Sequence, residues 1–85
     1  MRIRYSKHAK IRMAHRFISE AQIENTLIAP LQMRPTKYGR EVACKHFPQC
    51  YYIVVIFERV KEGFIVVTTV RVDRERVIRY GFTGI

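Results

Sequence analysis

The first third of the chain places apolar residues at helical spacing. Ser6 precedes a run without Gly or Pro, which predicts a helix from Lys7 to about Arg16 with Ser6 as its N-cap. Ser19 and Gln22 form the capping-box pattern S-x-x-Q, which predicts a second helix from Glu20 to Ala29 that ends before a proline. Each helix has one apolar stripe, so we expect an αα-hairpin whose stripes are Ala9, Met13 and Phe17, then Ile23 and Leu27.

The rest of the chain consists of strand-like segments separated by short turns. The predicted strands are residues 31–37, 40–47, 51–60 and 64–72, with 76–82 as a candidate last strand. Short turns between consecutive strands imply an antiparallel meander. The predicted fold is therefore one α+β domain over residues 1–85, with two N-terminal helices packed on a four- to five-stranded antiparallel sheet.

The two most β-prone segments are apolar on both faces. Residues 51–57 contain no charged side chain, and in the next segment Phe64, Val66 and Val70 are expected on one face with Ile65 and Val67 on the other. A sheet with one face in water would alternate apolar and polar residues. Two short helices can cover only one face, so we expect a second copy of the chain or a partner chain to cover the other.

Composition narrows the class of protein. The chain has 85 residues, of which 48% are hydrophobic, and this excludes disorder despite a net charge of +9. No apolar run approaches the ~20 residues that a membrane-spanning helix needs. The basic N-terminus has no apolar core of the kind that signal peptides carry. Two cysteines are too few for a disulfide framework, so we expect a cytoplasmic protein with reduced thiols.

The positive charge is unevenly distributed. Residues 1–19 contain six basic side chains and no acidic one, and four arginines lie close together near the C-terminus, at positions 71, 74, 76 and 79. Eleven of the 16 cationic residues are Arg, which suits bidentate phosphate contacts. This favours a nucleic-acid partner. A solvated basic face, a heat-adapted surface or an acidic protein partner are the alternatives.

The first predicted helix carries a candidate catalytic group. His8, Arg12 and His15 fall on one face, and Arg16 flanks them. Metal-free RNA cleavage needs a group that takes the 2′-hydroxyl proton, a group that protonates the leaving 5′-oxygen, and a cation for the phosphorane. Histidine can take either proton-transfer role near neutral pH. The alternative is that these are ordinary side chains on a helix surface.

Other chemistries receive less support. Cys44, His46 and Cys50 can supply three zinc ligands, but no second ligand pair follows, so free thiols are the preferred interpretation. There is no Gly-rich phosphate loop and no paired-carboxylate pattern, which disfavours NTP hydrolysis and glycosidase chemistry. We therefore predict no cofactor and no metal.

A second set of candidates lies on the strands. Arg71 interrupts an apolar strand, where it is either an edge cation or a phosphate ligand on a rigid element. Aromatic side chains can stack on unpaired bases, although strands favour tyrosine in any case; the candidates are Tyr38, Tyr51, Tyr52 and Tyr80.

The first predicted helix resembles that of a small family of uncharacterised prokaryotic domains. Their motif S-x-H-A-x-x-R-M-x-x-R-x-I-S is matched at every specified position from Ser6 to Ser19. That family is generally grouped with the RelE/ParE-like toxins, and the resemblance implies two N-terminal helices followed by an antiparallel sheet. It also implies a ribonuclease or translation inhibitor that is neutralised by a bound antitoxin. RelE-like enzymes usually cleave with Arg and Lys side chains on the sheet and a Tyr near the C-terminus, and the resemblance implies that Arg71 and Tyr80 fill such places here.

The leading hypothesis is a RelE-like, metal-independent endoribonuclease toxin. His8 and Tyr80 are its proton-transfer candidates, and the phosphate ligands are Arg12, Arg16 and Arg71. The remaining nucleic-acid contacts are expected from Lys7, Lys10, His15, Arg74 and Arg79. Expected partners are RNA, an antitoxin protein and a second copy through the uncovered sheet face, with no membrane. A non-catalytic nucleic-acid-binding module and a protein-interaction module are the alternatives.

Overall fold

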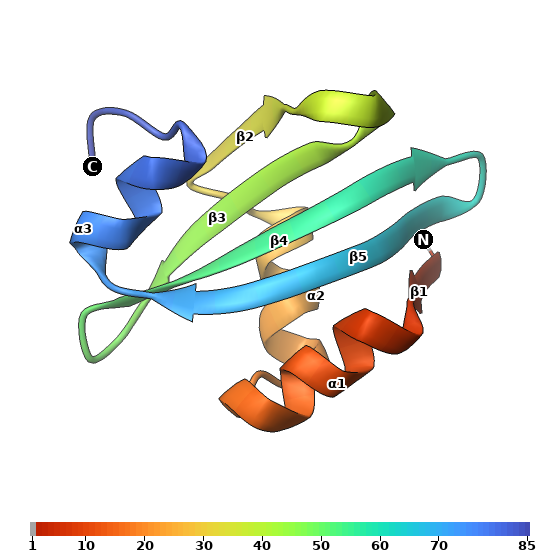
Figure 1. Cartoon of the computed structure of the whole chain (residues 1–85), viewed down its shortest axis with the longest axis horizontal. Helices are drawn as coiled ribbons and strands as arrows, with labels where there is room; N and C mark the ends of the chain where they lie inside the picture. The colour runs from red at the N-terminus through yellow and green to blue at the C-terminus, as the bar shows by residue number, and fades with distance from the viewer. Residues whose placement is uncertain (1) are drawn as a thin grey trace.

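A five-stranded sheet runs through the middle of the protein, in a computed structural model that describes residues 2–85 (Figure 1). The strand order is β1-β5-β4-β3-β2. β1 pairs with β5 in parallel, and all other neighbours are antiparallel. The strands are β1 (Arg2–Tyr5), β2 (Gln32–Pro35), β3 (Glu41–Phe47), β4 (Tyr51–Val60) and β5 (Gly63–Val72).

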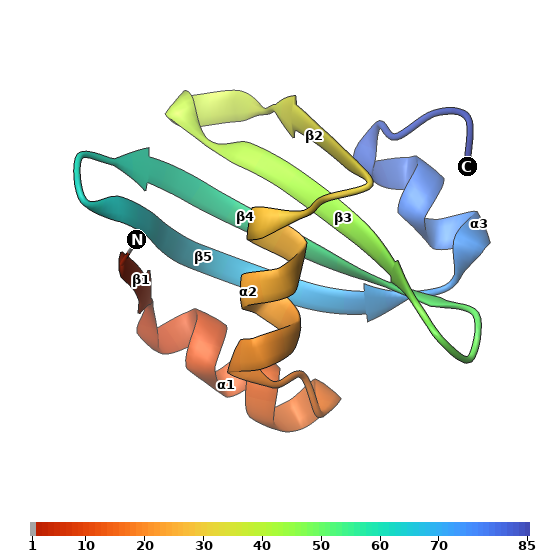
Figure 2. The ribbon, with the colours of Figure 1, turned by 180° about the vertical axis from the view of Figure 1, so that it is seen from behind.

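Both predicted N-terminal helices are confirmed, as α1 (Lys7–Arg16) and α2 (Glu20–Ile28). The side chain of Ser6 caps α1, and Ser19 and Gln22 make both hydrogen bonds of the capping box at α2. Both helices lie on one face of the sheet (Figures 1 and 2). Within residues 2–85 no helix has the length and apolar character that crossing a membrane requires.

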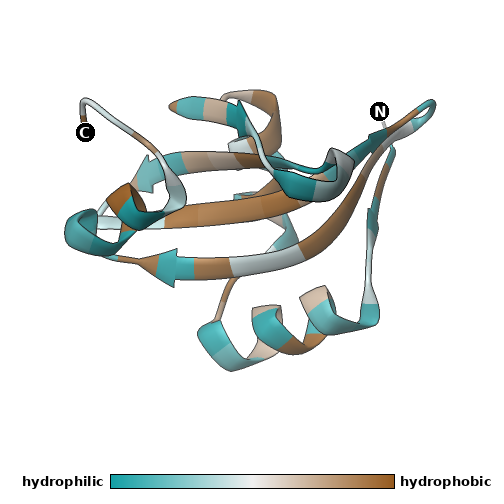
Figure 3. Cartoon of the chain, turned by 45° about the horizontal axis from the view of Figure 1, so that its top comes forward, coloured by the Kyte–Doolittle hydropathy of each residue, from teal (hydrophilic) through white to brown (hydrophobic). Residues whose placement is uncertain are grey.

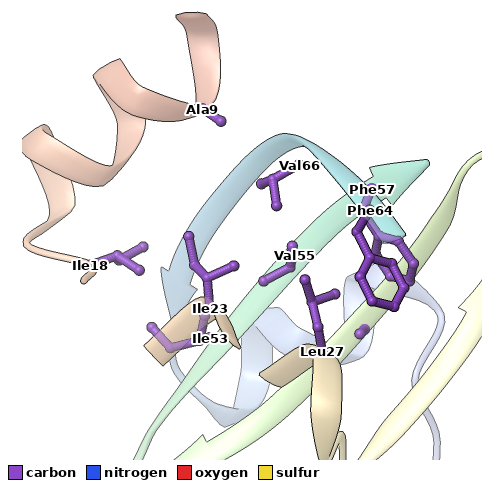
Figure 4. Packing of buried hydrophobic residues seen from close by; sticks show 10 residues of the cluster. Ala9, Ile18, Ile23, Leu27, Ile53, Val55, Phe57, Phe64 and Val66 are labelled. Atoms are coloured by element: carbon purple, nitrogen blue, oxygen red, sulfur yellow. The ribbon is translucent and has the colours of Figure 1, made fainter. Parts of the chain in front are cut away.

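The main core fills the space between these helices and the sheet. Figure 4 shows side chains from α1, α2 and the strands meeting there. Its buried members are Ala9, Ile18, Ile23, Leu27, Ala43, Ile53, Val55, Phe57, Phe64 and Val66. The expectation that Phe17 continues the apolar stripe of α1 is wrong. Phe17 has a left-handed backbone that ends the helix, and its side chain is 82% exposed.

The second face of the sheet is covered by the end of the same chain. The predicted strand 76–82 is instead α3 (Arg74–Val77) followed by the 3-10 turn η2 (Ile78–Tyr80). The reason is local, because the Asp73 side chain accepts the N–H of Arg76 and starts a helix. Val77 and Phe82 are fully buried against this face, so the expectation of an uncovered face is wrong. Figure 3 shows the apolar strands between α1 and this C-terminal segment, residues 74–85.

Hydrogen bonds from three side chains hold the C-terminal segment in place. The backbone N–H of Thr83 donates to the Gln32 side chain at 3.3 Å, and the Gln32 amide donates to the Thr83 carbonyl. The guanidinium of Arg34 donates to the carbonyl of Gly81. The guanidinium of Arg74 donates to the carbonyl of Ile85 at 2.9 and 3.1 Å. The segment is thus tied both to the edge strand β2 and to itself.

Strand β1 was not predicted, and it makes the sheet mixed rather than purely antiparallel. It pairs with residues 63–66 of β5. Beyond β1, the Ser6 N–H donates to the Val66 carbonyl at 3.0 Å and the Ser6 hydroxyl donates to that of Val67 at 2.8 Å. Gly63 permits the pairing because a Cβ there would overlap the carbonyl oxygen of Arg2. Four residues with alternating arginines do not reveal such a strand by themselves.

An irregularity in β5 changes which side chains share a face. Ile56 pairs with Thr68 and Phe57 with Val66, which leaves Val67 as an extra residue. As a result Val70 packs with the C-terminal segment instead of with Phe64 and Val66. The expectation that Val70 lies on the same face as Phe64 and Val66 is therefore wrong.

The predicted strand 31–37 is shorter than expected. It ends at Pro35, and the 3-10 turn η1 (Lys37–Gly39) follows. Tyr38 lies in this turn with a φ of 62°, and its side chain is 88% exposed.

Candidate functional site

An open pocket of about 340 Å³ lies at the edge of the sheet where β5 ends. Its lining consists of Arg16, Val70, Val72, Arg76, Arg79 and Tyr80. The edge is accessible because β1 pairs only with residues 63–66 of β5. The second half of β5 thus has a strand neighbour on one side alone.

Four elements bring these side chains together, namely α1, β5, α3 and η2. Arg16 is the last residue of α1, which runs alongside β5 and ends near the end of that strand (Figures 1 and 2). Val70 and Val72 face the C-terminal segment because of the irregularity at Val67. Arg76 belongs to α3, which begins just after β5, and Arg79 and Tyr80 belong to η2, which follows α3 directly.

The pocket is strongly cationic. Three of its six lining residues are arginines, at positions 16, 76 and 79, and none is acidic. Within residues 2–85 the two ion pairs lie elsewhere, between Arg40 and Glu58 and between Arg59 and Glu41. Guanidinium groups without a carboxylate partner attract anions, and their planar donors match phosphate oxygens. The pocket is therefore suited to a phosphate group.

The structure brings part of the predicted site together. Arg16, Arg79 and Tyr80 all line the pocket. Arg76 joins them, although its position in the sequence marked it only as a member of a basic group. Its spacing of three residues from Arg79 places both on one side of a helix, but the segment was expected to be a strand. The cap at Asp73 is the signal in the sequence that could have revealed this helix.

The other candidates on α1 lie outside the pocket. Arg12 is half-buried, and its Nε lies 3.4 Å from Nε2 of His8 in hydrogen-bonding geometry. His8 precedes Arg16 by eight residues, which corresponds to roughly 12 Å along the helix axis. His8, Arg12 and Arg16 form a stripe that leads along α1 to the pocket. The remaining candidates on this helix are exposed, namely Lys7, Lys10 and His15.

Arg71 and Arg74 are engaged in other contacts. Arg71 pairs with Ile53 on the helix-covered face of the sheet, and its guanidinium lies 5.3 Å from the ring centre of Tyr51. The Tyr51 hydroxyl in turn accepts a hydrogen bond of 2.9 Å from the Gln22 side chain. Arg74 holds the carbonyl of Ile85. Neither arginine is among the pocket-lining residues.

The predicted thiols are free and differ in environment. Cys44 is buried under the C-terminal segment. This burial raises the pKa of its thiol, and a hydrogen bond with the backbone of Gln32 offsets part of that rise in pKa. Cys50 is exposed in the turn before β4. His46 is exposed and its ring lies 4.8 Å from that of Tyr52. Within the described residues no three His, Cys, Asp or Glu side chains gather in a way that could hold a metal ion.

Comparison with known proteins identifies a family without an assigned activity. Searches among curated proteins and among solved structures gave no match. The family model described as "Domain of unknown function (DUF4258)" matches residues 5–78. The matched region contains Arg16 and Arg76 of the pocket and ends just before Arg79 and Tyr80. Because the match covers most of its length, the chain belongs to the DUF4258 family.

Proposed function

We propose that this protein binds RNA in the cationic pocket and cleaves the RNA backbone without a metal ion, in the manner of a RelE-like toxin. The observation that carries the proposal is the convergence of Arg16, Arg76, Arg79 and Tyr80 on one open pocket. The net charge of +9 supports it by concentrating polyanions near the surface. The resemblance of the first helix to a family grouped with RelE/ParE-like toxins supports the choice of RNA over other polyanions.

The proposed reaction is an internal transesterification. The 2′-oxygen attacks the neighbouring phosphorus, the P–O2′ bond forms and the P–O5′ bond breaks, which leaves a 2′,3′-cyclic phosphate and a 5′-hydroxyl. The arginines of the pocket stabilise the extra negative charge of the phosphorane. Tyr80 donates the proton that the departing 5′-oxygen takes up and then regains a proton from water. The 2′-hydroxyl proton passes to water.

This proposal gives the histidine a different part. His8 lies about two helical turns from Arg16 and does not line the pocket, so this proposal routes no proton through it. In this proposal His8 and Arg12 instead contact the RNA strand as it leaves the pocket along α1. A catalytic role for His8 stays a prediction that its alanine variant tests.

The direct test is the cleavage of labelled RNA, both free and on translating ribosomes, with and without EDTA. The wild-type protein should form 2′,3′-cyclic phosphate ends that persist in EDTA. Tyr80→Phe should lower the cleavage rate by about 100-fold or more while RNA binding persists. Arg79→Ala should lower the cleavage rate and also weaken RNA binding. Lys61→Ala is the matched control, because it removes one exposed charge at the opposite end of β5.

A non-catalytic RNA-binding protein is the second candidate. Tyr80 is the one lining residue suited to donating a proton, and no histidine or carboxylate lines the pocket. A protein that only binds RNA would cleave it neither free nor on translating ribosomes, and would still bind it. Replacing one arginine by alanine would then lower the dependence of log affinity on log salt by about 0.7 for each phosphate that the protein no longer neutralises.

The proposal also concerns partners and compartment. The resemblance to RelE/ParE-like toxins implies an antitoxin, and RNA substrates imply action in the cytoplasm. The C-terminal segment covers the sheet face that was expected to take a second copy or a partner. We therefore propose that an antitoxin binds at the cationic pocket, where an acidic segment can pair with the arginines.

A further inference from the structure

Phe17 combines an unfavourable backbone with an exposed aromatic ring. Its φ and ψ of 54° and 45° are those of a left-handed residue, which Gly or Asn usually supplies at a helix end. The side chain is 82% exposed, the second-largest exposed fraction among the large hydrophobic residues at the surface of the described chain. Neither helix termination nor core packing requires a phenylalanine here. The ring is therefore a candidate for contact with a ligand.

The contacts around Phe17 fix the backbone of this residue directly after Arg16, which lines the cationic pocket. Its N–H donates to the carbonyl of Met13, and the N–H of Ile18 donates to the same carbonyl at 3.0 Å. Ile18 is buried in the main core, whereas Arg16 lines the pocket. The backbone of Phe17 is thus anchored on both sides, and its ring extends into solvent next to a pocket-lining residue.

We propose that Phe17 is a stacking platform for one unpaired base of an RNA strand whose phosphate lies in the pocket. This inference rests on the RNA binding proposed above and makes the ligand single-stranded, because a base in a duplex is already stacked on its neighbours. Aromatic rings beside a cationic groove are how proteins bind single strands without regard to sequence. An apolar protein partner fits less well, because residues 1–19 contain six basic side chains.

The absence of tryptophan from the chain provides a direct probe. Phe17→Trp keeps an aromatic ring and makes it the sole tryptophan. A single-stranded RNA octamer should quench its fluorescence. An octamer of the same length without bases should bind through its phosphates and leave the fluorescence unchanged, and a blunt duplex should do likewise. Equal quenching by the base-free octamer, or no quenching by the RNA octamer, would overturn the stacking role.

A second variant separates stacking from folding. Phe17→Gly removes the ring and accepts the left-handed backbone, so its melting temperature should equal or exceed that of the wild type. It should bind the RNA octamer about 10-fold more weakly and the base-free octamer equally well. Unchanged RNA affinity would refute the proposal for Phe17 alone. If Arg16→Ala weakened binding of neither octamer, the pocket itself would be refuted as the RNA site.

Discussion

Phe82 tests whether the C-terminal segment closes the second face of the sheet. Its side chain is fully buried in a cluster with Val54, Val72 and Val77. Phe82→Ala would remove most of a phenylalanine ring from a packed environment and leave a cavity. Substitutions of this kind cost about 3–5 kcal/mol, the sum of the lost transfer free energy and the cavity term. A domain of this kind has a total free energy of unfolding of only about 5–15 kcal/mol.

The assay is urea unfolding followed by circular dichroism. With a slope of about 1.5 kcal/mol per molar urea, the loss corresponds to a fall of roughly 2–3 M in the unfolding midpoint. Ile78→Ala is the matched control, because Ile78 lies in the same segment and is 51% exposed. It should change the free energy of unfolding by less than about 1 kcal/mol. A Phe82→Ala variant as stable as the control would show that the segment does not cover the sheet.

Three further variants probe other parts of the fold. Gly63→Ala should destabilise the protein by about 2 kcal/mol or more, because the new methyl group overlaps the Arg2 carbonyl and the backbone φ is positive; faster amide exchange in β1 would report it. Ser19→Ala should cost about 1 kcal/mol in thermal unfolding through loss of the capping box, and no loss would contradict the role of that cap. In native protein a thiol reagent should modify Cys50 rapidly and Cys44 only on unfolding. Because the pKa of Cys44 is raised on folding, the free energy of unfolding should decline above about pH 9, and Cys44→Ala should lessen that decline.

Local signals in the sequence predicted the α-helical hairpin and most of the sheet. Both N-caps lie within three residues of the amides that they satisfy, so they could be read without knowledge of the fold. Strands β3, β4 and β5 follow from β-prone runs between clear turns. The basic character of the chain and the membership of Arg16, Arg79 and Tyr80 in a candidate site were also visible in the sequence.

Elements that depend on distant partners were missed or misassigned. β1 is a strand only because β5 lies beside it, and the Ser6–Val67 contact that continues this pairing joins residues 61 positions apart. The face of the sheet on which Val70 lies depends on one extra residue at position 67. A shift of one residue in a strand moves every following side chain to the other face. The C-terminal helix carried a readable cap at Asp73, but its packing on the sheet did not follow from that cap.

The candidate site shows the same division between sequence and tertiary structure. Composition indicated a small, basic, folded domain, and the order of residues placed arginines near both ends of the chain. Tertiary structure decided which of them meet, because α1 runs alongside β5 and the C-terminal segment folds back over the sheet. This arrangement brings Arg16 to Arg79 and Tyr80 and leaves His8 two helical turns away. Proximity between residues far apart in the chain arises from packing, which a local pattern does not encode.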